Sequence, residues 1–386
     1  MSRPCMSSAW IGEGAPNMTH RPLRVGVIGA NWGLNHIDAW RAVPGVEVTA
    51  ICTSRRDTAE AAARETGVPR PMWDAQQMLA DPTLDIIDVT PRPSIRAPLA
   101  LQALQAGKHL MQPLPFSIGL GHAFALREEA RSRNLIAVVE NLHRHTPGFR
   151  QAKELIDKGA LGRILTIRGH VRTGILLSPS AGYVYEWITD AGSGASALRN
   201  FGAHLLHVLV WLFGDIAAVC ADISTRLPEI HFSDGSRKLN GTADSATVLT
   251  RYKSGAGGAI DVSWCTSAGE GFSIDAVGEL GRLVVRAEGL GPQKVQLWLA
   301  GRKARELELQ SIDECFRKVP GLDLLEDPEQ PRRFPLAAMC AGMAEAIRTG
   351  NHLHAHPDFE EAYSVMRVVE AAYQSAETGN WCDVHA

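Results

Sequence analysis

Two histidines and a tyrosine are the side chains in this sequence best suited to proton transfer. His204 and His207 lie three positions apart in the segment 201–213, whose apolar run predicts a helix. At that spacing both imidazoles lie on one helix face, and an imidazole titrates near neutral pH, which suits a general acid or base. Tyr185 stands in the long loop before this helix, where a tyrosine can donate a proton to a carbonyl oxygen. The alternative is a pair of core histidines and a loop aromatic that covers a sheet.

The stretch 24–36 predicts a strand, a tight turn and a helix. Its β-branched apolar residues suit a buried strand, and a helix that begins near Trp32 directs free backbone amides at the turn. A dinucleotide pyrophosphate is the usual occupant of such a site. The turn is one residue shorter than Gly-x-Gly-x-x-Gly and has Asn31, which tolerates positive φ, in place of the middle glycine. The predicted cofactor-binding residues here are Gly29, Asn31, Trp32 and Gly33; an ordinary strand-to-helix turn is the alternative.

The next predicted strand, 46–52, ends without a carboxylate. In nucleotide-binding units an acidic residue at this place holds the adenosine ribose hydroxyls, but here the chain continues Thr53-Ser54-Arg55-Arg56. Guanidinium groups bind phosphate through fixed bidentate donors. Ser54, Arg55 and Arg56 therefore predict a bound 2′-phosphate, and so NADP in preference to NAD. The alternative is that the two arginines only begin the solvated helix 57–66.

Strands and helices alternate through the first part of the chain, with further strands predicted at 86–90, 109–112 and 136–140. This alternation predicts an α/β fold with a parallel, doubly wound sheet, whose ligands bind beyond the carboxyl ends of the strands. The loop 91–96 follows one such end. The residues expected to line the nicotinamide half of the site are Thr90, Pro91, Arg92, Gln112, Pro113 and Asn141.

The pattern changes after about residue 146. Short alternating runs separated by glycine turns fill 216–300 and predict a mostly antiparallel sheet with one solvated face. Helices are predicted at 149–158, 201–213, 335–347 and 359–378. The expected division is a flexible tail at 1–21, a dinucleotide-binding domain at 22–145, a substrate and oligomerisation domain at 146–334, and closing helices at 335–386.

Composition excludes several classes of protein. The 386 residues are 45% hydrophobic and 21% charged, with a formal net charge of −3, so no basic field for nucleic acid is expected. No apolar run has the length of a transmembrane helix. The seven cysteines show no C-x-x-C pair, which favours a reduced, cytoplasmic protein. We expect no nucleic-acid or membrane partner.

Two other groups of residues are candidates for ligand binding. Arg92, Arg96 and Arg144 lie on predicted loops and together suggest a carboxylated substrate, although loop arginines are usually solvated. Histidines alternate at 352, 354 and 356. No carboxylate or thiol is spaced to complete a metal site there, so no metal is predicted.

The sequence resembles the Gfo/Idh/MocA family of nicotinamide-dependent oxidoreductases from about residue 22 to 384. Within the family, the segment 30–33, Thr225–Pro228 and Asp244-Ser245 resemble the branch that includes the yeast galactose-regulon repressor, a regulatory binder. The stretches that carry the family resemblance are the opening turn, Gly107–Pro115, Ala152–Ile156 with Gly159 and Gly162, Gly202-Ala-His204, Glu360–Tyr363 and Val369–Ser375.

The resemblance implies a Rossmann domain and an open-faced α/β domain whose sheet often mediates homodimers or homotetramers. It implies hydride transfer between the nicotinamide and a ring carbinol or ketone of a sugar, cyclic polyol or dihydrodiol. A lysine from a Glu-Lys-Pro motif and an Asp-x-x-x-His pair assist the proton in the family, and Arg144 resembles a family arginine that contacts cofactor.

The sequence departs from the family at two of these catalytic positions. The Glu-Lys-Pro position reads Pro113-Leu114-Pro115, and the Asp-x-x-x-His position begins with Asn200. Leucine cannot carry a proton, and an amide can orient a hydroxyl but cannot stabilise an imidazolium by charge. The expected catalytic set is therefore His204, His207, Tyr185 and Asn200 in an NADP(H)-dependent oxidoreductase. The alternatives are a redox-neutral enzyme with tightly bound cofactor and a catalytically silent regulator.

Overall fold

The structure is a computed structural model of the whole chain and describes residues 21–183, 185–291, 293–319, 321–327 and 329–385. Nearly all of the predicted N-terminal tail lies outside the described residues.

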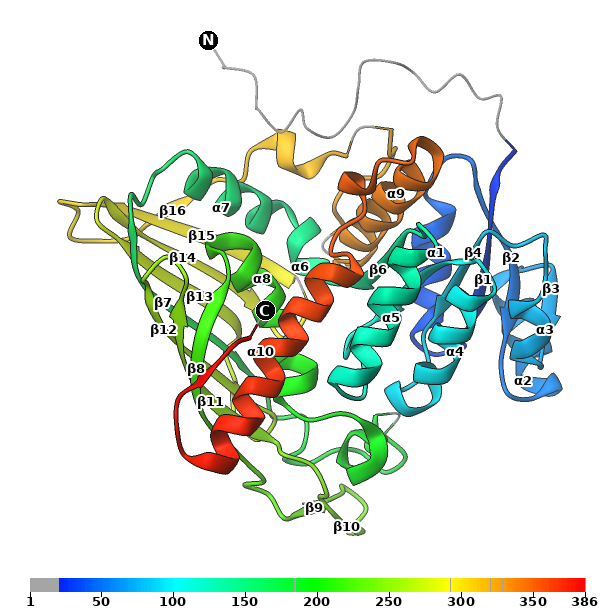
Figure 1. Cartoon of the computed structure of the whole chain (residues 1–386), viewed down its shortest axis with the longest axis horizontal. Helices are drawn as coiled ribbons and strands as arrows, with labels where there is room; N and C mark the ends of the chain where they lie inside the picture. The colour runs from blue at the N-terminus through cyan, green and yellow to red at the C-terminus, as the bar shows by residue number, and fades with distance from the viewer. Residues whose placement is uncertain (1–20, 184, 292, 320, 328, 386) are drawn as a thin grey trace.

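A six-stranded parallel sheet forms the first layer, in the order β3-β2-β1-β4-β5-β6 (Figure 1). The chain enters at β1 and winds outward in both directions, which confirms the doubly wound sheet. The strands are β1 Leu23–Ile28, β2 Val46–Cys52, β3 Arg70–Met72, β4 Ile86–Val89, β5 His109–Pro113 and β6 Ala137–Glu140. The helices are α1 Gly33–Arg41, α2 Arg56–Thr66, α3 Ala75–Leu79, α4 Pro93–Gln105, α5 Leu120–Ser132 and α6 Leu142–His145.

One predicted connection of this sheet differs in the structure. The expected loop 91–96 is short, because α4 begins at Pro93 rather than near Leu99. Proline is well suited to the first turn of a helix, where its missing N–H has no partner to lose. Arg96 consequently lies inside α4, where it is buried, instead of on a solvated loop.

A nine-stranded mixed sheet forms the second domain, in the order β16-β15-β14-β13-β7-β12-β11-β8-β17. β7 and β12 pair in parallel and the other neighbours are antiparallel, as the alternating runs predict. The strands are β7 Ile164–Arg172, β8 Ile216–Ser224, β11 Ser245–Tyr252, β12 Gly257–Ser263, β13 Gly271–Gly278, β14 Gly281–Glu288, β15 Gln293–Gly301, β16 Glu308–Gln310 and β17 Cys382–Asp383. A separate hairpin joins β9 Glu229–His231 to β10 Arg237–Leu239.

Helices cover one face of the large sheet, while the outer face, at the left of Figure 1, carries none in the described part of the chain. In β11 buried and exposed residues alternate, as expected for a strand with one solvated face. The covering helices are α7 Pro147–Asp157, α8 Ala203–Phe213 and α10 Phe359–Thr378. The short helical turns are η2 Glu186–Thr189, η3 Ala191–Ser193, η4 Leu198–Gly202, η5 Glu314–Arg317 and η6 His352–His354, the last of which packs against α9.

The last two long helices pack on the first domain, and the second of them also contacts the second domain. α9, Arg333–Thr349, packs on α1, and its Phe334 and Met343 belong to the same apolar core as Trp40. α10 lies against both α5 of the first domain and β8 of the second. These contacts hold the strand ends of the first sheet opposite α8, and the candidate site lies between them.

Candidate active site

A cavity of about 600 Å³ lies where the carboxyl ends of β1, β4, β5 and β6 meet the second domain. The sequence-predicted site residues that line it are Asn31, Trp32, Thr90, Pro91, Arg92, Pro113, Tyr185, Asn200 and His204. The predicted residues that do not line it are Gly29, Gly33, Ser54, Arg55, Arg56, Gln112, Asn141, Arg144 and His207. The cavity therefore brings the expected proton-transfer groups together with the strand ends expected at the nicotinamide.

The turn after β1 has the geometry of a phosphate cradle. Gly29 has a φ of +103°, and a Cβ there would lie 2.4 Å from Thr90 Oγ1, so only glycine fits. Gly33 is also tight against Thr90. Trp32 is the N-cap residue of α1, and its side chain makes no capping hydrogen bond. Backbone amides at this helix N-terminus are therefore available to bind an anion. The chain thus fits a dinucleotide.

Asn31 does not serve the turn in the way its residue type suggests. The described non-glycine residues with positive φ are Asn134, Ala268 and Lys294, so the expectation of a left-handed Asn31 is wrong. In this turn Gly29 is the residue with positive φ. Asn31 is instead free to line the cavity with its side chain.

The residues expected at the 2′-phosphate follow β2 and lie on the surface. Arg55 pairs with Asp57 (3.2 Å) and Arg56 with Glu60 (2.8 Å), and the Arg56 guanidinium lies 5.0 Å from the Trp73 ring centroid. These ion pairs are exposed and so are weak. Both arginines remain available to exchange a carboxylate for a stronger phosphate contact.

His204 reaches the cavity from the first turn of α8, directly after the π-type turn η4 that holds Asn200. Such turns are common at functional sites. The side-chain amide of Asn141 donates to the His204 carbonyl (3.0 Å). Burial lowers the pKa of His204 to about 4, although Glu140 acts to raise it. His204 is therefore neutral at pH 7 and able to accept a proton.

His207 shares the helix face with His204 but is buried behind it, at 5% exposure. Burial lowers its pKa to about 3. The predicted helical spacing is present, yet only the first of the two rings reaches the cavity.

Aromatic side chains from the loop before α8 form the opposite wall. Tyr183 and Tyr185 have ring centroids 5.7 Å apart, and Trp187 stands beside them in the cavity lining. Burial raises the pKa of Tyr185, so its hydroxyl is protonated and can donate. Lys238 fixes this loop by pairing with Glu186 (3.0 Å) and Asp190 (2.8 Å).

The strand end at β5 gives the cavity an apolar wall at the position where the sequence resemblance implies a lysine. Leu114 and Pro113 line it, and Leu114 belongs to an apolar cluster with Phe116 and Phe359. Gln112 lies behind the wall and donates to the Phe116 carbonyl (2.9 Å).

The structure does not gather the three arginines considered for a substrate carboxylate. Arg92 and Arg96 both line the cavity, and the Arg96 guanidinium also donates to the carbonyls of Pro91 and Pro115. Arg144 is absent from the lining, because it pairs with Glu361 (2.6 Å) and lies over Trp211.

Three charged lining residues were not among the predicted residues. Arg332 comes from the connector before α9, and its guanidinium lies 5.2 Å from the Trp32 ring centroid. Arg172 comes from the end of β7 and pairs with Asp261. Glu140 is the last residue of β6. Its position at a strand end, next to Asn141, was the one feature of the sequence that could have indicated it as a site residue.

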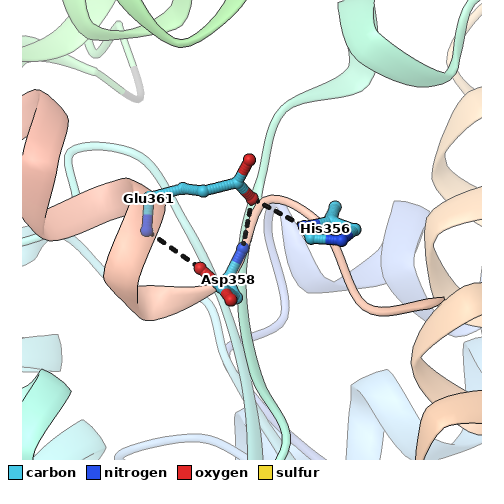
Figure 2. A group of neighbouring side chains, drawn as sticks. All are labelled: His356, Asp358 and Glu361. Atoms are coloured by element: carbon cyan, nitrogen blue, oxygen red, sulfur yellow. Dashed lines mark hydrogen bonds and ion pairs between the residues drawn. The ribbon is translucent and has the colours of Figure 1, made fainter. Parts of the chain in front are cut away.

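Figure 2 shows His356, Asp358 and Glu361, whose possible ligand atoms lie within 4.8 Å of one another. Asp358 accepts from the Glu361 amide (2.9 Å) and Glu361 from the Asp358 amide (3.1 Å), which is a capping box at the start of α10. Glu361 also pairs with His356 and Arg144. The expectation that no carboxylate is spaced to join these histidines is wrong, because Asp358 and Glu361 lie beside His356; both carboxylates are hydrogen-bonded in the cap of α10.

Comparison with known proteins agrees with this architecture. Residues 23–141 match the model of an oxidoreductase family with an NAD-binding Rossmann fold, and residues 149–284 match a GFO/IDH/MocA C-terminal domain. Levoglucosan dehydrogenase of Pseudarthrobacter phenanthrenivorans is 24% identical over 94% of this chain and 98% of its own length. D-apiose dehydrogenase of Rhizobium rhizogenes is 26% identical over 96% and 99%.

Solved structures show the same fold. A levoglucosan dehydrogenase in complex with NADH and L-sorbose superposes with a TM-score of 0.84 at 23% identity, covering 95% of this chain and all of that one. An Agrobacterium radiobacter oxidoreductase in complex with NAD⁺, L-tartaric acid and magnesium has a TM-score of 0.75 at 20% identity, covering 94% and 98%.

The fold and the cavity together define a dinucleotide-dependent oxidoreductase. The chain belongs to the Gfo/Idh/MocA family and is an NAD(P)-dependent enzyme of that family. None of the helices in the described part of the chain has the length and apolar character needed to cross a bilayer.

Proposed function

We propose that this enzyme transfers a hydride between NADP(H) and a ring carbinol or ketone of a sugar, cyclic polyol or dihydrodiol. The observation that carries this proposal is the shared cavity. It joins the dinucleotide turn, through Asn31 and Trp32, to an imidazole and a tyrosine hydroxyl on the facing domain. The sugar class is supported by relatives that are named levoglucosan dehydrogenase and D-apiose dehydrogenase.

In this proposal His204 accepts the hydroxyl proton as the alcohol is oxidised and returns it in the reverse direction. The bound nicotinamide supplies the hydride acceptor. Tyr185 donates a hydrogen bond to the reacting oxygen, and Asn200 orients the substrate from the start of the same helix. His207 supports the His204 ring from behind. The apolar wall at Leu114 excludes water, which strengthens these polar contacts.

NADP is the proposed cofactor because Ser54, Arg55 and Arg56 follow β2 in place of a carboxylate. NAD remains the alternative. The uncovered face of the nine-stranded sheet supports a homodimer or homotetramer, and we place the enzyme in the cytoplasm.

Two observations favour a second candidate, a redox-neutral enzyme or a cofactor-binding regulator. Leu114 and Asn200 have each lost an ionisable group that the family uses. In a redox-neutral enzyme the hydride would return to the substrate after an elimination, and a regulator would bind cofactor without turnover.

The test is a panel of sugars, inositols, sugar acids and cyclic diols with the purified protein and NADP⁺ or NAD⁺, followed by absorbance of the reduced nicotinamide. We expect steady formation of NADPH with at least one cyclic polyol or sugar. Cofactor binding without redox change on any compound would favour the second candidate.

A further inference from the structure

A buried chain of charged side chains runs beneath the dinucleotide turn and ends at the cavity. His36 lies on α1 with no exposed surface, and its Nδ1 contacts Asp88 Oδ2 at 2.8 Å. Its Nε2 contacts Glu140 Oε2 at 3.2 Å. The indoles of Trp40 and Trp32 donate to Asp88 (2.8 Å) and to Glu140 Oε2 (2.6 Å). Glu140 is thus fixed from two sides.

His36, Asp88 and Glu140 together carry one net negative charge, and the nearby guanidinium of Arg96 interacts with both carboxylates. Burial opposes a charged imidazole, but the carboxylates of Asp88 and Glu140 outweigh it and raise the pKa of His36 to about 10. The protonated ring therefore lies between two carboxylates. Burying charges in this way is costly unless each is paired, and Glu140 is the carboxylate of this group that lines the cavity. Among the described residues, no hydrogen bond to its other oxygen, Oε1, is found.

We propose that Glu140 is a positioning residue that supplies the negative charge of this cavity, in place of the carboxylate that the family carries where this chain has Asn200. It stabilises positive charge that forms there, on the His204 ring when it takes a proton and on an oxidised nicotinamide. This inference rests on the proposed function for the role of His204. The charge itself is a property of the chain alone.

The link from Glu140 to His204 is structural as well as electrostatic. Both side chains line the same cavity, and Asn141, the residue after Glu140, donates its amide to the His204 carbonyl at 3.0 Å. Glu140 also raises the pKa of His204 against the effect of burial. An imidazolium formed at His204 therefore has a carboxylate to stabilise it, which the amide of Asn200 cannot provide.

Other titratable or charged groups act on this pair from every element around it. Arg96 on α4 and Arg332 before α9 carry positive charge, and both line the cavity. The groups whose charges interact with Glu140 or His204 are His36, Arg96, His143, His207, Tyr185 and Cys340, while Asp88 acts on His36 and Arg332 on Tyr185. Of these, Asp88 alone is another acidic side chain, and it is already paired with His36 and Trp40.

The test compares the affinities for NADP⁺ and NADPH, measured by fluorescence titration, in wild type and Glu140→Gln. The oxidised ring carries a positive charge that the reduced ring lacks. We expect the substitution to weaken NADP⁺ binding by about tenfold or more and to leave NADPH binding nearly unchanged, as for the loss of one close opposite charge. Glu140→Asp should keep the wild-type ratio, and Glu279→Gln, which removes a surface partner of Arg163, serves as control.

Asn200→Asp is the second variant, and it avoids any folding defect at a buried position because Asn200 is half-buried. Asn200→Asp alone should increase the affinity for NADP⁺ relative to the affinity for NADPH. Glu140→Gln alone should also lower turnover and lower the pKa of the acid limb of the pH profile of kcat. Adding Asn200→Asp to it should restore part of that turnover and raise this pKa again.

Equal weakening of both cofactor forms in Glu140→Gln would show that Glu140 is merely structural and would overturn the inference. An unchanged ratio of the NADP⁺ affinity to the NADPH affinity in both Glu140→Gln and Asn200→Asp would overturn the inference too. Failure of the wild-type enzyme on every substrate would instead count against the proposed function, while the binding ratio would still decide the role of Glu140.

Discussion

At the scale of single residues, the chemistry depends on which side chain handles the proton once the family lysine is absent. Leu114 and Pro113 make that part of the wall apolar, and His204 is the histidine of α8 that reaches the cavity. The sequence indicated His204 through its spacing and motif. It placed Glu140 at a strand end but could not show its partners, because the contacts of Glu140 with Trp32 and His36 join residues about a hundred positions apart.

His204→Asn should lower kcat by about a hundredfold or more, the usual effect of losing a general acid or base, while cofactor affinity stays near wild type. His207→Asn should cost much less, because that ring does not line the cavity. Steady-state kinetics and cofactor titration check both, with His352→Asn on the surface turn η6 as control. Equal losses at 204 and 207 would contradict the assignment.

Leu114→Lys should slow turnover by about tenfold or more rather than restore a family activity. Pro113 and Glu140 are register partners on β5 and β6, so an ammonium at 114 would enter the cavity next to Glu140 and offset its charge. Kinetics on a substrate of the wild-type enzyme decide the matter, and Leu114→Met controls for the change of shape. Faster turnover in Leu114→Lys would contradict this expectation and would mean that the site can still use a lysine at position 114 for proton transfer.

At the scale of elements, strands and helices with clear periodicity were predicted well. Strands β11 to β14 and helix α10 lie where the alternating runs and the helical pattern indicated. The short strand β3 was not predicted, because three residues are too few to show an alternation of apolar and polar side chains. The early start of α4 and the π-type turn η4 depend on local backbone contacts and on packing, which periodicity does not record.

The junction of β2 and α2 is the element that should set cofactor preference. Replacing Arg55 and Arg56 together by Ala should weaken NADPH binding by about tenfold or more and leave NADH binding nearly unchanged, because only NADPH carries the 2′-phosphate. Fluorescence titration measures both affinities, and Arg64→Ala on the same helix is the control. An equal effect on the two cofactors would contradict a 2′-phosphate site.

At the scale of the whole molecule, the fold class followed from the order of elements, but the meeting of the two domains did not. The cavity lies between two domains that α10 joins, because this helix packs on α5 of the first domain and on α8 and β8 of the second. Long-range packing of this kind brought Arg332 of the connector onto Trp32, and no local pattern encodes it.

Buried histidines should make the protein labile to mild acid. Burial lowers the pKa of His143, His145 and His207 to about 3 each, whereas an unfolded histidine titrates near 6.5. Below that pH the unfolded chain binds more protons, so stability falls by up to about 1.4 kcal/mol per histidine per pH unit. Urea unfolding at pH 7 and at lower pH should show the loss, and His207→Gln should reduce it. A pH-independent midpoint would contradict the neutral, buried state of these rings.

Net hydride transfer is the central claim, and isotope tracing tests it most directly. A cyclic polyol or sugar that is turned over would be prepared with deuterium on the reacting carbinol carbon and incubated with the enzyme and NADP⁺. The account predicts one deuterium in each released NADPH and one ketone formed per NADPH. Product that retains its deuterium, formed without release of reduced cofactor, would contradict it and identify a redox-neutral enzyme.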